Sequence, residues 1–419
     1  MTILIVNASV YILTLLIYVY KVRCFNLGTM LLSLYAVSAC TSVFFYNHEL
    51  FELSIHDSVM TWQPFIYLYI VLMIFFFPVL KFRSDKIESV EFSESFKFNV
   101  LVYLVIFTSL VCMVIYFPFM IKGMEGDIGE NRTSVMTEGL KLDMNPIVSI
   151  TVRVGIALRD IAILLFFYML AYQREKRILL ILLGICAFVA PIVVSLAWSA
   201  RTIVLFLLFS FLTCYLLFYK TLTKKIKLTI NWIFASVFGF LFIIFLIISF
   251  ARFGENDLFG IDFFMLKYIG ENFINFNGIL YDQVDNYLYG GNSFPIFRRL
   301  LGLEYWTSIA DFRDYADYFT GVPVWIFYLF VGTFYLDFGP RITFFIALVI
   351  CVIGYRYFKN TPKIPFHRLI LFILIYNMYT EGLFYFSLCD EPGNLKIIIH
   401  ILLYFYFRID FKTRTLMPA

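Results

Sequence analysis

Residues 228–250 read LTINWIFASVFGFLFIIFLIISF, and residues 251–260, which follow directly, read ARFGENDLFG. The first run is long and apolar enough for a helix that crosses about 30 Å of hydrocarbon, which takes about 20 residues. The second opens a long stretch, Ala251–Val322, that is rich in Tyr, Phe, Asp and Asn and carries lysine and arginine. Such a stretch does not enter a bilayer, so we expect a membrane protein with one large extramembrane loop.

The rest of the chain repeats the apolar pattern. With 62% hydrophobic and 15% charged residues and a mean hydropathy of +0.86, the composition lies far outside the soluble globular range. We therefore predict an all-α polytopic membrane protein. Its eleven expected spans are 2–20, 27–46, 64–80, 98–119, 148–172, 178–197, 202–219, 228–250, 341–357, 367–388 and 395–407.

The basic residues predict the orientation of these spans. Lysine and arginine gather at every second junction, which the positive-inside rule makes cytoplasmic. The N-terminus is then outside, the C-terminus is cytoplasmic, and the long loop is outside. The groups are Lys21/Arg23, Lys81/Arg83/Lys86/Lys97, Arg174/Lys176/Arg177, Lys220/Lys224/Lys225/Lys227, Arg356/Lys359/Lys363/Arg368 and Arg408/Lys412/Arg414.

One segment, VPVWIFYLFVGTFYLDFGP at 322–340, departs from this pattern. It is apolar but has two prolines and Asp337 near its end. We interpret residues 323–339 as a re-entrant or interfacial helix, and if they span instead, the later topology inverts. The predicted divisions are a bundle of eight helices (1–250), the periplasmic loop with the re-entrant segment (251–339), and the C-terminal helices with a cytoplasmic tail (340–419).

Charged residues inside the spans are the first candidates for function. Arg153, Arg159 and Asp160 lie in the fifth span, where a cation costs at least about 2.5 kcal/mol at the bilayer centre. Arg153 either reaches a wet cavity or snorkels to the interface. Arg159 and Asp160 make either a substrate contact or an ion pair with another span. Glu381 is an intramembrane carboxylate that relays protons or bonds to a neighbouring helix.

A second candidate is Arg201 in SLAWSARTIVLF, at the start of a span. Small neighbours such as Ser199 and Ala200 let the backbone approach an anionic group, and the guanidinium adds a planar donor fork to the positive end of the helix. An arginine at this position is also an ordinary interfacial anchor.

The long loop holds the third group of candidates. In FPIFRRLLGLEYW, Arg298 and Arg299 suit a pyrophosphate, and Tyr305 and Trp306 suit the faces of sugars. The alternative is an amphipathic helix on anionic lipid headgroups. The row Asp311, Asp314 and Asp317 favours a solvated acidic face over a metal site, and we expect no metal and no cofactor.

These features together resemble the Wzy-type oligosaccharide repeat-unit polymerases, the O-antigen or capsule polymerases of bacterial inner membranes. The resemblance rests on Ser199-Ala200-Arg201-Thr202 at the start of a span, on the single large loop late in the chain, and on GTFYLDFGPR at 332–341. It implies a membrane glycosyltransferase of GT-C-like architecture. Such an enzyme joins undecaprenyl-pyrophosphate-linked oligosaccharide repeat units at the periplasmic face and releases undecaprenyl pyrophosphate, without a metal.

The resemblance also implies residue roles and partners. Arginines would bind the diphosphate, first Arg201, then Arg153 and Arg299, then Arg298 and Arg341. Candidates for the base are Asp285, Asp337 and Glu381. Partners would be the lipid-linked oligosaccharide, the lipid bilayer, a chain-length regulator and a flippase, with no nucleic acid. The chain lacks the paired loop motifs in which a glycine follows an arginine by eleven residues: Leu164 and Ile309 stand there.

Three other functions compete with this interpretation. A flippase or transporter of the same lipid-linked oligosaccharide favours two repeated halves, which the sequence does not show. A membrane acyltransferase needs a histidine or aspartate activation motif, for which His400 alone is poor support. A scaffold without enzymatic activity has no need of Arg153 and Arg201 at the depth of a cavity.

Overall fold

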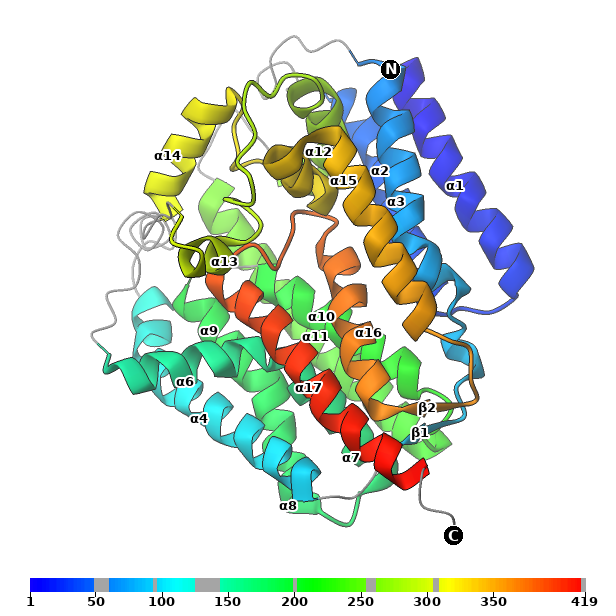
Figure 1. Cartoon of the computed structure of the whole chain (residues 1–419), viewed down its shortest axis with the longest axis vertical. Helices are drawn as coiled ribbons and strands as arrows, with labels where there is room; N and C mark the ends of the chain where they lie inside the picture. Colours follow the sequence, from blue (N-terminus) through cyan, green and yellow to red (C-terminus); the bar gives the residue numbers. More distant parts are fainter. Residues whose placement is uncertain are drawn as a thin grey trace. The chain divides into compact units, whose positions relative to one another are not determined.

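The computed structural model describes residues 1–48, 60–92, 96–124, 144–198, 202–253, 261–303 and 309–415 (Figure 1). The described part is almost entirely helical, with one short two-stranded parallel pair, β1 (Ser89–Glu91) and β2 (Lys363–Pro365). Within it, six helices are long and apolar enough to cross a membrane, or seven if one bent pair is a single span. These helices are those of a multi-pass membrane protein, and the count of eleven spans stays a prediction.

Each expected span nevertheless coincides with helix. The spans correspond, in order, to α1 (Thr2–Val22), α2 (Leu27–Tyr46), α3 (Trp62–Lys81), α4 (Phe96–Met124), α6 with α7 (Pro146–Ala157 and Arg159–Tyr172), α8 with α9 (Arg177–Gly184 and Ala190–Ala197, joined by the π-helical turn η3, Ile185–Val189), α10 (Thr202–Phe218), α11 (Lys224–Phe253), the second part of α15 (Leu329–Tyr357), α16 (Phe366–Glu381) and α17 (Glu391–Thr415).

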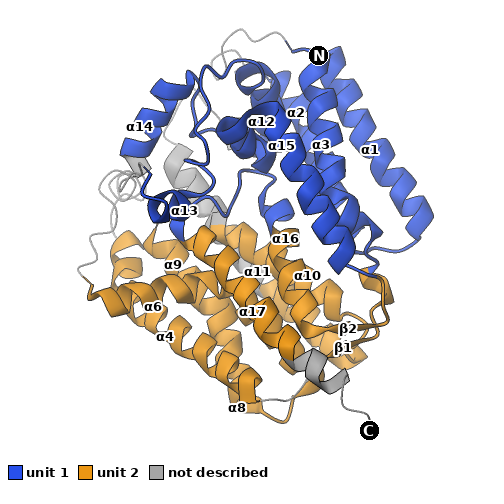
Figure 2. Cartoon of the chain, viewed as in Figure 1, with its two compact units in different colours: residues 1–83, 249–359, 378–391 blue, residues 84–248, 360–377, 392–419 orange. Residues whose placement is uncertain are grey.

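The chain forms two compact units that interleave along the sequence (Figure 2). Unit 1 comprises residues 1–83, 249–359 and 378–391, and unit 2 comprises residues 84–248, 360–377 and 392–419. These divisions cut across the boundaries predicted from the sequence at 250 and 339. The reason is that the long stretch after Ala251 belongs to the same unit as the first three helices.

In unit 1, α15 is two helical pieces with a reversal between them. Before the reversal, the Phe330 ring lies 4.9 Å from the Phe75 ring, and the Tyr335 ring lies 6.1 Å from the Tyr67 ring. After it, the Tyr355 ring lies 6.0 Å from the Phe77 ring. The chain before the reversal therefore runs along α3 towards the start of that helix, and the chain after the reversal runs back beside α3. The membrane position of 323–339, re-entrant or interfacial, stays a prediction.

The reversal occurs at Gly339, where φ is 72° and ψ is 178°. A positive φ of this size favours glycine, and a Cβ here would lie 2.7 Å from the Tyr287 ring. Pro340 follows and cannot donate to the preceding turn, which keeps the two helical pieces separate. The Tyr67 hydroxyl donates to the Pro340 carbonyl at 2.8 Å and fixes the reversal against α3.

The start of α15 is buried and receives backbone partners from the segment after α16. The Leu329 N–H donates to the Phe384 carbonyl at 3.1 Å, and the Phe330 N–H donates to the Gly382 carbonyl at 2.8 Å. The first N–H groups of a helix have no partner within the helix, so this pairing satisfies two of them in an apolar core. Gly382 is required because a Cβ would lie 2.3 Å from the Met378 carbonyl oxygen.

The described part of the long stretch after Ala251 holds three helices, α12 (Ile261–Asn275), α13 (Pro295–Leu300) and α14 (Ile309–Thr320), and a π-helical turn η4 (Phe276–Leu280). α12 packs along α2: the rings of Phe263 and Phe45 lie 5.5 Å apart, and the Ser38 hydroxyl donates to the Ile269 carbonyl at 2.5 Å. The stretch is therefore not a separate cap, because its first helix is part of the core of unit 1.

Unit 2 is a bundle in which α4 packs against α6 and α9, and α7 packs against α10 and α8. α6 and α7 meet at an angle of 55°, with the break at Leu158. The residues that follow the break are Arg159 and Asp160. A sharp bend at a charged pair requires protein partners for both, and these partners form the network described below.

Candidate functional site

A cluster of tyrosines gathers three distant segments of unit 1. Tyr67 of α3, Tyr281 after η4 and Tyr335 of α15 lie in mutual contact, with ring centroids 5.6 to 6.1 Å apart. Tyr287 joins them 6.5 Å from Tyr335, and Phe276 lies beneath, 5.7 Å from Tyr335. Tyr335 is buried, whereas Tyr67, Tyr281 and Tyr287 are half-buried. We call Tyr67, Tyr281, Tyr287 and Tyr335 the tyrosine cluster.

Polar groups rim the tyrosine cluster. The Gln63 side-chain amide donates to the Tyr281 hydroxyl at 3.2 Å, and the Asp282 N–H donates to the Tyr335 hydroxyl at 3.1 Å. Asp282 has a φ of 57°, the left-handed conformation that asparagine and aspartate adopt more readily than most residues. The side chains of Gln63 and Asp282 are exposed beside the rings. Ring faces next to an amide and a carboxylate match a sugar, whose C–H faces stack and whose hydroxyls bond.

Asp337 holds the loop around this cluster. Its carboxylate is fully buried and accepts the Asn292 N–H at 2.9 Å and the Ser293 N–H at 2.6 Å, one on each oxygen. Its carbonyl accepts the Tyr289 N–H at 2.8 Å. Because both carboxylate oxygens already bind backbone amides, the geometry favours a positioning role for Asp337 over that of a base for an acceptor hydroxyl.

The two arginines of α13 already have partners inside unit 1. Arg298 Nη1 donates to the carbonyls of Leu288 and Tyr289 at 3.0 and 3.2 Å, and Arg299 Nη1 pairs with Glu391 Oε1 at 2.7 Å. Arg298 thus fastens the same loop as Asp337. Arg299 and Glu391 remain partly exposed, so this pair can open to another anion at the cost of one surface ion pair.

Glu271 of α12 is a buried carboxylate that the sequence analysis missed. It lies in a row of buried polar residues with Asn272 and Asn275, and the Asn275 side-chain amide donates to the Phe327 carbonyl at 3.0 Å. Burial raises the pKa of Glu271 from 4.5 to about 7, against the opposing effects of Lys267 and Asn275. Glu271 lies outside the candidate spanning helices and titrates near neutral pH.

Glu271→Gln should therefore change how the stability of the protein depends on pH. The folded protein holds the Glu271 proton more tightly than the unfolded chain, so stability is lost as the pH rises from 4.5 to about 7, the two pKa values. At 1.36 kcal/mol per pKa unit the loss is at most about 3 kcal/mol. We expect the thermal unfolding midpoint of the variant to lie above that of the native protein at pH 8 and close to it at pH 5. Thermal unfolding in detergent at both pH values measures this, and equal midpoints at pH 8 would contradict it.

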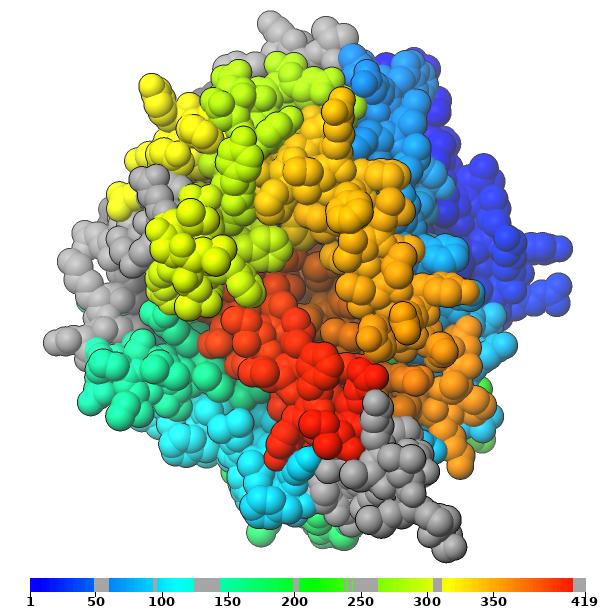
Figure 3. Space-filling model, in the orientation of Figure 1, coloured from blue at the N-terminus to red at the C-terminus, as the bar shows by residue number. Residues whose placement is uncertain are grey.

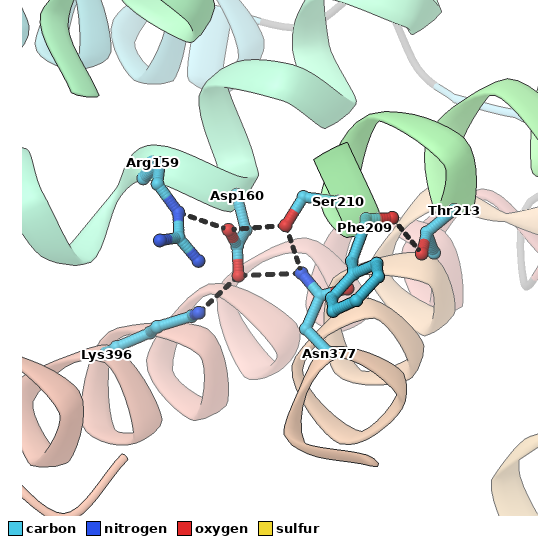
Figure 4. Close-up of polar contacts among 7 residues, drawn as sticks. All are labelled: Arg159, Asp160, Phe209, Ser210, Thr213, Asn377 and Lys396. Atoms are coloured by element: carbon cyan, nitrogen blue, oxygen red, sulfur yellow. Dashed lines mark hydrogen bonds and ion pairs between the residues drawn. The ribbon is translucent and has the colours of Figure 1, made fainter. Parts of the chain in front are cut away.

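In unit 2, Asp160 is the centre of a buried polar network that joins four helices (Figure 4). Oδ1 accepts from Arg159 Nε at 2.9 Å and from the Ser210 hydroxyl of α10 at 3.2 Å. Oδ2 accepts from Asn377 Nδ2 of α16 at 2.9 Å and pairs with Lys396 Nζ of α17. Asn377 Nδ2 also donates to the Ser210 hydroxyl at 2.9 Å. The expected ion pair with another span is thus present, and its partner is Lys396.

This network makes a structural role for Arg159 the simpler interpretation. Asp160 is fully buried, and Arg159 and Lys396 are nearly so. One carboxylate with four donors is stable in an apolar core because each of its lone pairs is used. Beside it, His400 Nδ1 donates to the Lys396 carbonyl at 2.8 Å. His400 is therefore a packing residue.

Arg153 lies elsewhere in unit 2, where the ends of α4, α6 and α9 meet. Tyr116 of α4 is buried there in an apolar cluster with Val152 and Ala197. Arg153 lies close enough to act electrostatically on Tyr116, and the Trp198 side chain is a hydrogen-bonding partner of the same tyrosine. Arg153 is exposed, and Trp198 directly precedes Ser199-Ala200-Arg201, which lies outside the described residues.

The remaining candidates are dispersed. Asp285 is exposed and its N–H donates to the Thr320 carbonyl at 2.9 Å, Glu381 is buried at the end of α16, and Arg341 is exposed just after the reversal of α15. Tyr305 and Trp306 lie outside the described residues. Asp317 accepts the Val324 N–H at 2.6 Å, so it caps a turn. Among the described residues, no group of three His, Cys, Asp or Glu side chains has a metal-binding arrangement.

No family model, no curated protein and no solved structure matches this chain. The resemblance to the repeat-unit polymerases therefore rests on the sequence motifs and the predicted topology.

Proposed function

We propose that the chain is a glycosyltransferase of the bacterial inner membrane that polymerises oligosaccharide repeat units carried on undecaprenyl pyrophosphate. The growing chain is transferred from its carrier to the non-reducing sugar of another lipid-linked unit. The product is an O-antigen or a capsular polysaccharide, and undecaprenyl pyrophosphate is released. The basic residues at alternate junctions favour a reaction at the periplasmic face.

The observation that carries this proposal is that Arg153 acts electrostatically on Tyr116, a buried tyrosine of unit 2. Trp198, three residues before Arg201 in the sequence, is a hydrogen-bonding partner of the same tyrosine. The bond that breaks joins the anomeric carbon of the growing chain to an oxygen of the diphosphate. The diphosphate gains negative charge as this bond breaks. Guanidinium groups fixed near that oxygen stabilise the developing charge more than the ground state, and this lowers the barrier.

The reaction also needs an acceptor site and a base. The acceptor hydroxyl forms the new bond to the anomeric carbon and gives its proton to a carboxylate. Asp285 and Glu381 remain candidates for this base. Asp285 is exposed and lies close in sequence to the tyrosine cluster, whereas the carboxylate of Asp337 is bonded to backbone amides. Within unit 1, the tyrosine cluster with Gln63 and Asp282 at its rim has the ring faces and hydrogen-bonding groups that a sugar requires.

Arg153→Ala tests the role proposed for Arg153. Loss of one of the two guanidiniums should shorten the polymer strongly while lipid-linked single units accumulate, because charge stabilisation is lost only in the transition state. The matched control is Arg174→Ala, an exposed arginine at the opposite end of the same bent pair whose Nε donates to the Leu170 carbonyl. Gel analysis of polysaccharide from a strain without its own copy of the gene measures chain length. Normal polymer from Arg153→Ala at normal protein level would exclude the role.

A flippase or transporter is the second candidate, and one observation favours it. The 55° break between α6 and α7 lies at the Arg159–Asp160 pair, and broken helices with charged residues are a feature of transport sites. The two functions differ in where single units accumulate when the gene is deleted. Loss of a polymerase leaves them in the periplasmic leaflet, where a membrane-impermeant oxidant reaches the sugars, and loss of a flippase leaves them protected in the cytoplasmic leaflet.

A further inference from the structure

The turn that contains α13 presents an apolar surface in unit 1. Leu300 and Leu301 are 73% and 75% exposed, and Leu303, Phe297 and Tyr289 are also exposed. We call these five residues the α13 patch. Figure 3 shows the segment before residue 303 in yellow-green. Exposed leucines in such a group are unusual on a surface that faces only water.

Both arginines of the same turn have partners within unit 1. Arg298 is bonded to the carbonyls of Leu288 and Tyr289, and Arg299 is paired with Glu391. The turn therefore satisfies its charged groups within the protein and leaves leucines outside.

The α13 patch adjoins the end of the membrane-type helix α15. Phe294, at the start of α13, packs 6.3 Å from Phe334 and 6.4 Å from Phe338, measured between ring centroids. Just beyond the reversal at Gly339, α15 exposes an apolar stripe at the spacing of one helix face that includes Ile342, Phe345, Val349 and Val352. The exposed surface of a spanning helix faces lipid, and Phe294 places the start of α13 against Phe338, which precedes this stripe by four residues.

We propose that the α13 patch inserts into the boundary between the headgroups and the acyl chains of the bilayer, so that this part of the long loop is anchored in the membrane. Leucines with an aromatic residue on one side and paired charges on the other are the composition of interfacial elements. The anchor goes beyond the proposed function, because the contact with lipid holds whichever reaction the protein performs. It keeps the tyrosine cluster, which is held by the same loop, at the level of the membrane surface.

Site-directed spin labelling in nanodiscs tests this anchor. Leu301→Cys carries the label, in a background in which Cys24, Cys40, Cys351 and Cys389 are alanine. Phe345→Cys, on the exposed stripe of α15, is the control for lipid contact, and Tyr318→Cys, 90% exposed on α14, is the control for water contact. Collisions with oxygen report hydrocarbon, and collisions with a water-soluble nickel chelate report solvent.

The expected result is that oxygen collides with the label at Leu301 more often than the nickel chelate does, as at Phe345, with the reverse at Tyr318. Solvent-like collisions at Leu301 would overturn the proposal. A label at Leu301 shielded from both agents would also overturn it, because it would show that protein, from a partner or a second copy, covers the patch. Polymer length plays no part in this measurement, so its outcome is independent of the proposed reaction.

Discussion

Arg201→Ala is expected to abolish polymer while single repeat units still appear on the lipid carrier. Removal of one donor that stabilises developing charge costs roughly 100- to 1,000-fold in turnover, which leaves no long chains within a generation of growth. Gel electrophoresis of polysaccharide from a strain that depends on the variant gives the chain-length distribution. Immunoblotting of membranes gives the protein level needed to interpret it.

Arg201→Lys is the matched variant for this prediction. Lysine keeps the charge but lacks the planar fork that binds two oxygens of a phosphate at once, so rescue should be poor. Full polymer from the lysine variant would reduce the role of Arg201 to charge alone. Normal chains from the alanine variant, at normal protein level, would reject a catalytic role for this residue.

Asp160→Ala should be the most destabilising single substitution in unit 2. It leaves Arg159 and Lys396 without their shared carboxylate in a buried position, and removal of one partner from a buried ion pair costs about 3 to 5 kcal/mol. We expect a large fall in the amount of folded protein and in the thermal unfolding midpoint of the purified protein. Size-exclusion chromatography and thermal unfolding in detergent measure these two quantities.

The double variant Asp160→Ala/Lys396→Met separates stability from function. Methionine removes the cation that the alanine variant leaves unpaired and keeps much of the apolar stem, so part of the lost stability should return. If the single variant is as stable as the native protein, the network does not hold unit 2 together. A substrate contact would then be the better account of Arg159.

The helices could be predicted from the sequence because their signal is local. A run of about 20 apolar residues specifies a membrane helix whatever its neighbours are, and helices stand at all the expected positions. The re-entrant interpretation of 323–339 also used local information, namely the prolines and Asp337. These residues did not predict which side chains would contact the reversal at Gly339. They are Tyr67 and Tyr287, which are distant in sequence.

The interior of unit 1 was less predictable. The stretch after Ala251 is polar enough to suggest a separate cap, yet α12 packs along α2 through Phe263 and Ile269. The signal that was available is the polar group Glu271, Asn272 and Asn275, which recurs with helical spacing beside apolar residues. Only the partner helix shows that this polar row is buried.

The sequence predicted the chemical types of the site residues. It did not predict the groups to which these residues bond. Arg298, Arg299 and Asp337 are the residue types that a diphosphate and an acceptor hydroxyl require, but here they bond to carbonyls, to Glu391 and to backbone amides. A single sequence does not reveal such pairings, because Asp337 and Ser293 become neighbours only through the fold. Arg153 is exposed and acts on Tyr116, and its role in binding the diphosphate stays a prediction.

The most direct test of the account is polymerisation by the purified protein in nanodiscs. The substrate is the lipid-linked oligosaccharide extracted from a strain that lacks this gene, in which single units accumulate. The account predicts a ladder of longer lipid-linked chains with stoichiometric release of undecaprenyl pyrophosphate, and neither product from the Arg153→Ala/Arg201→Ala variant. Unchanged single units with the native protein, or the same ladder with the double variant, would contradict it.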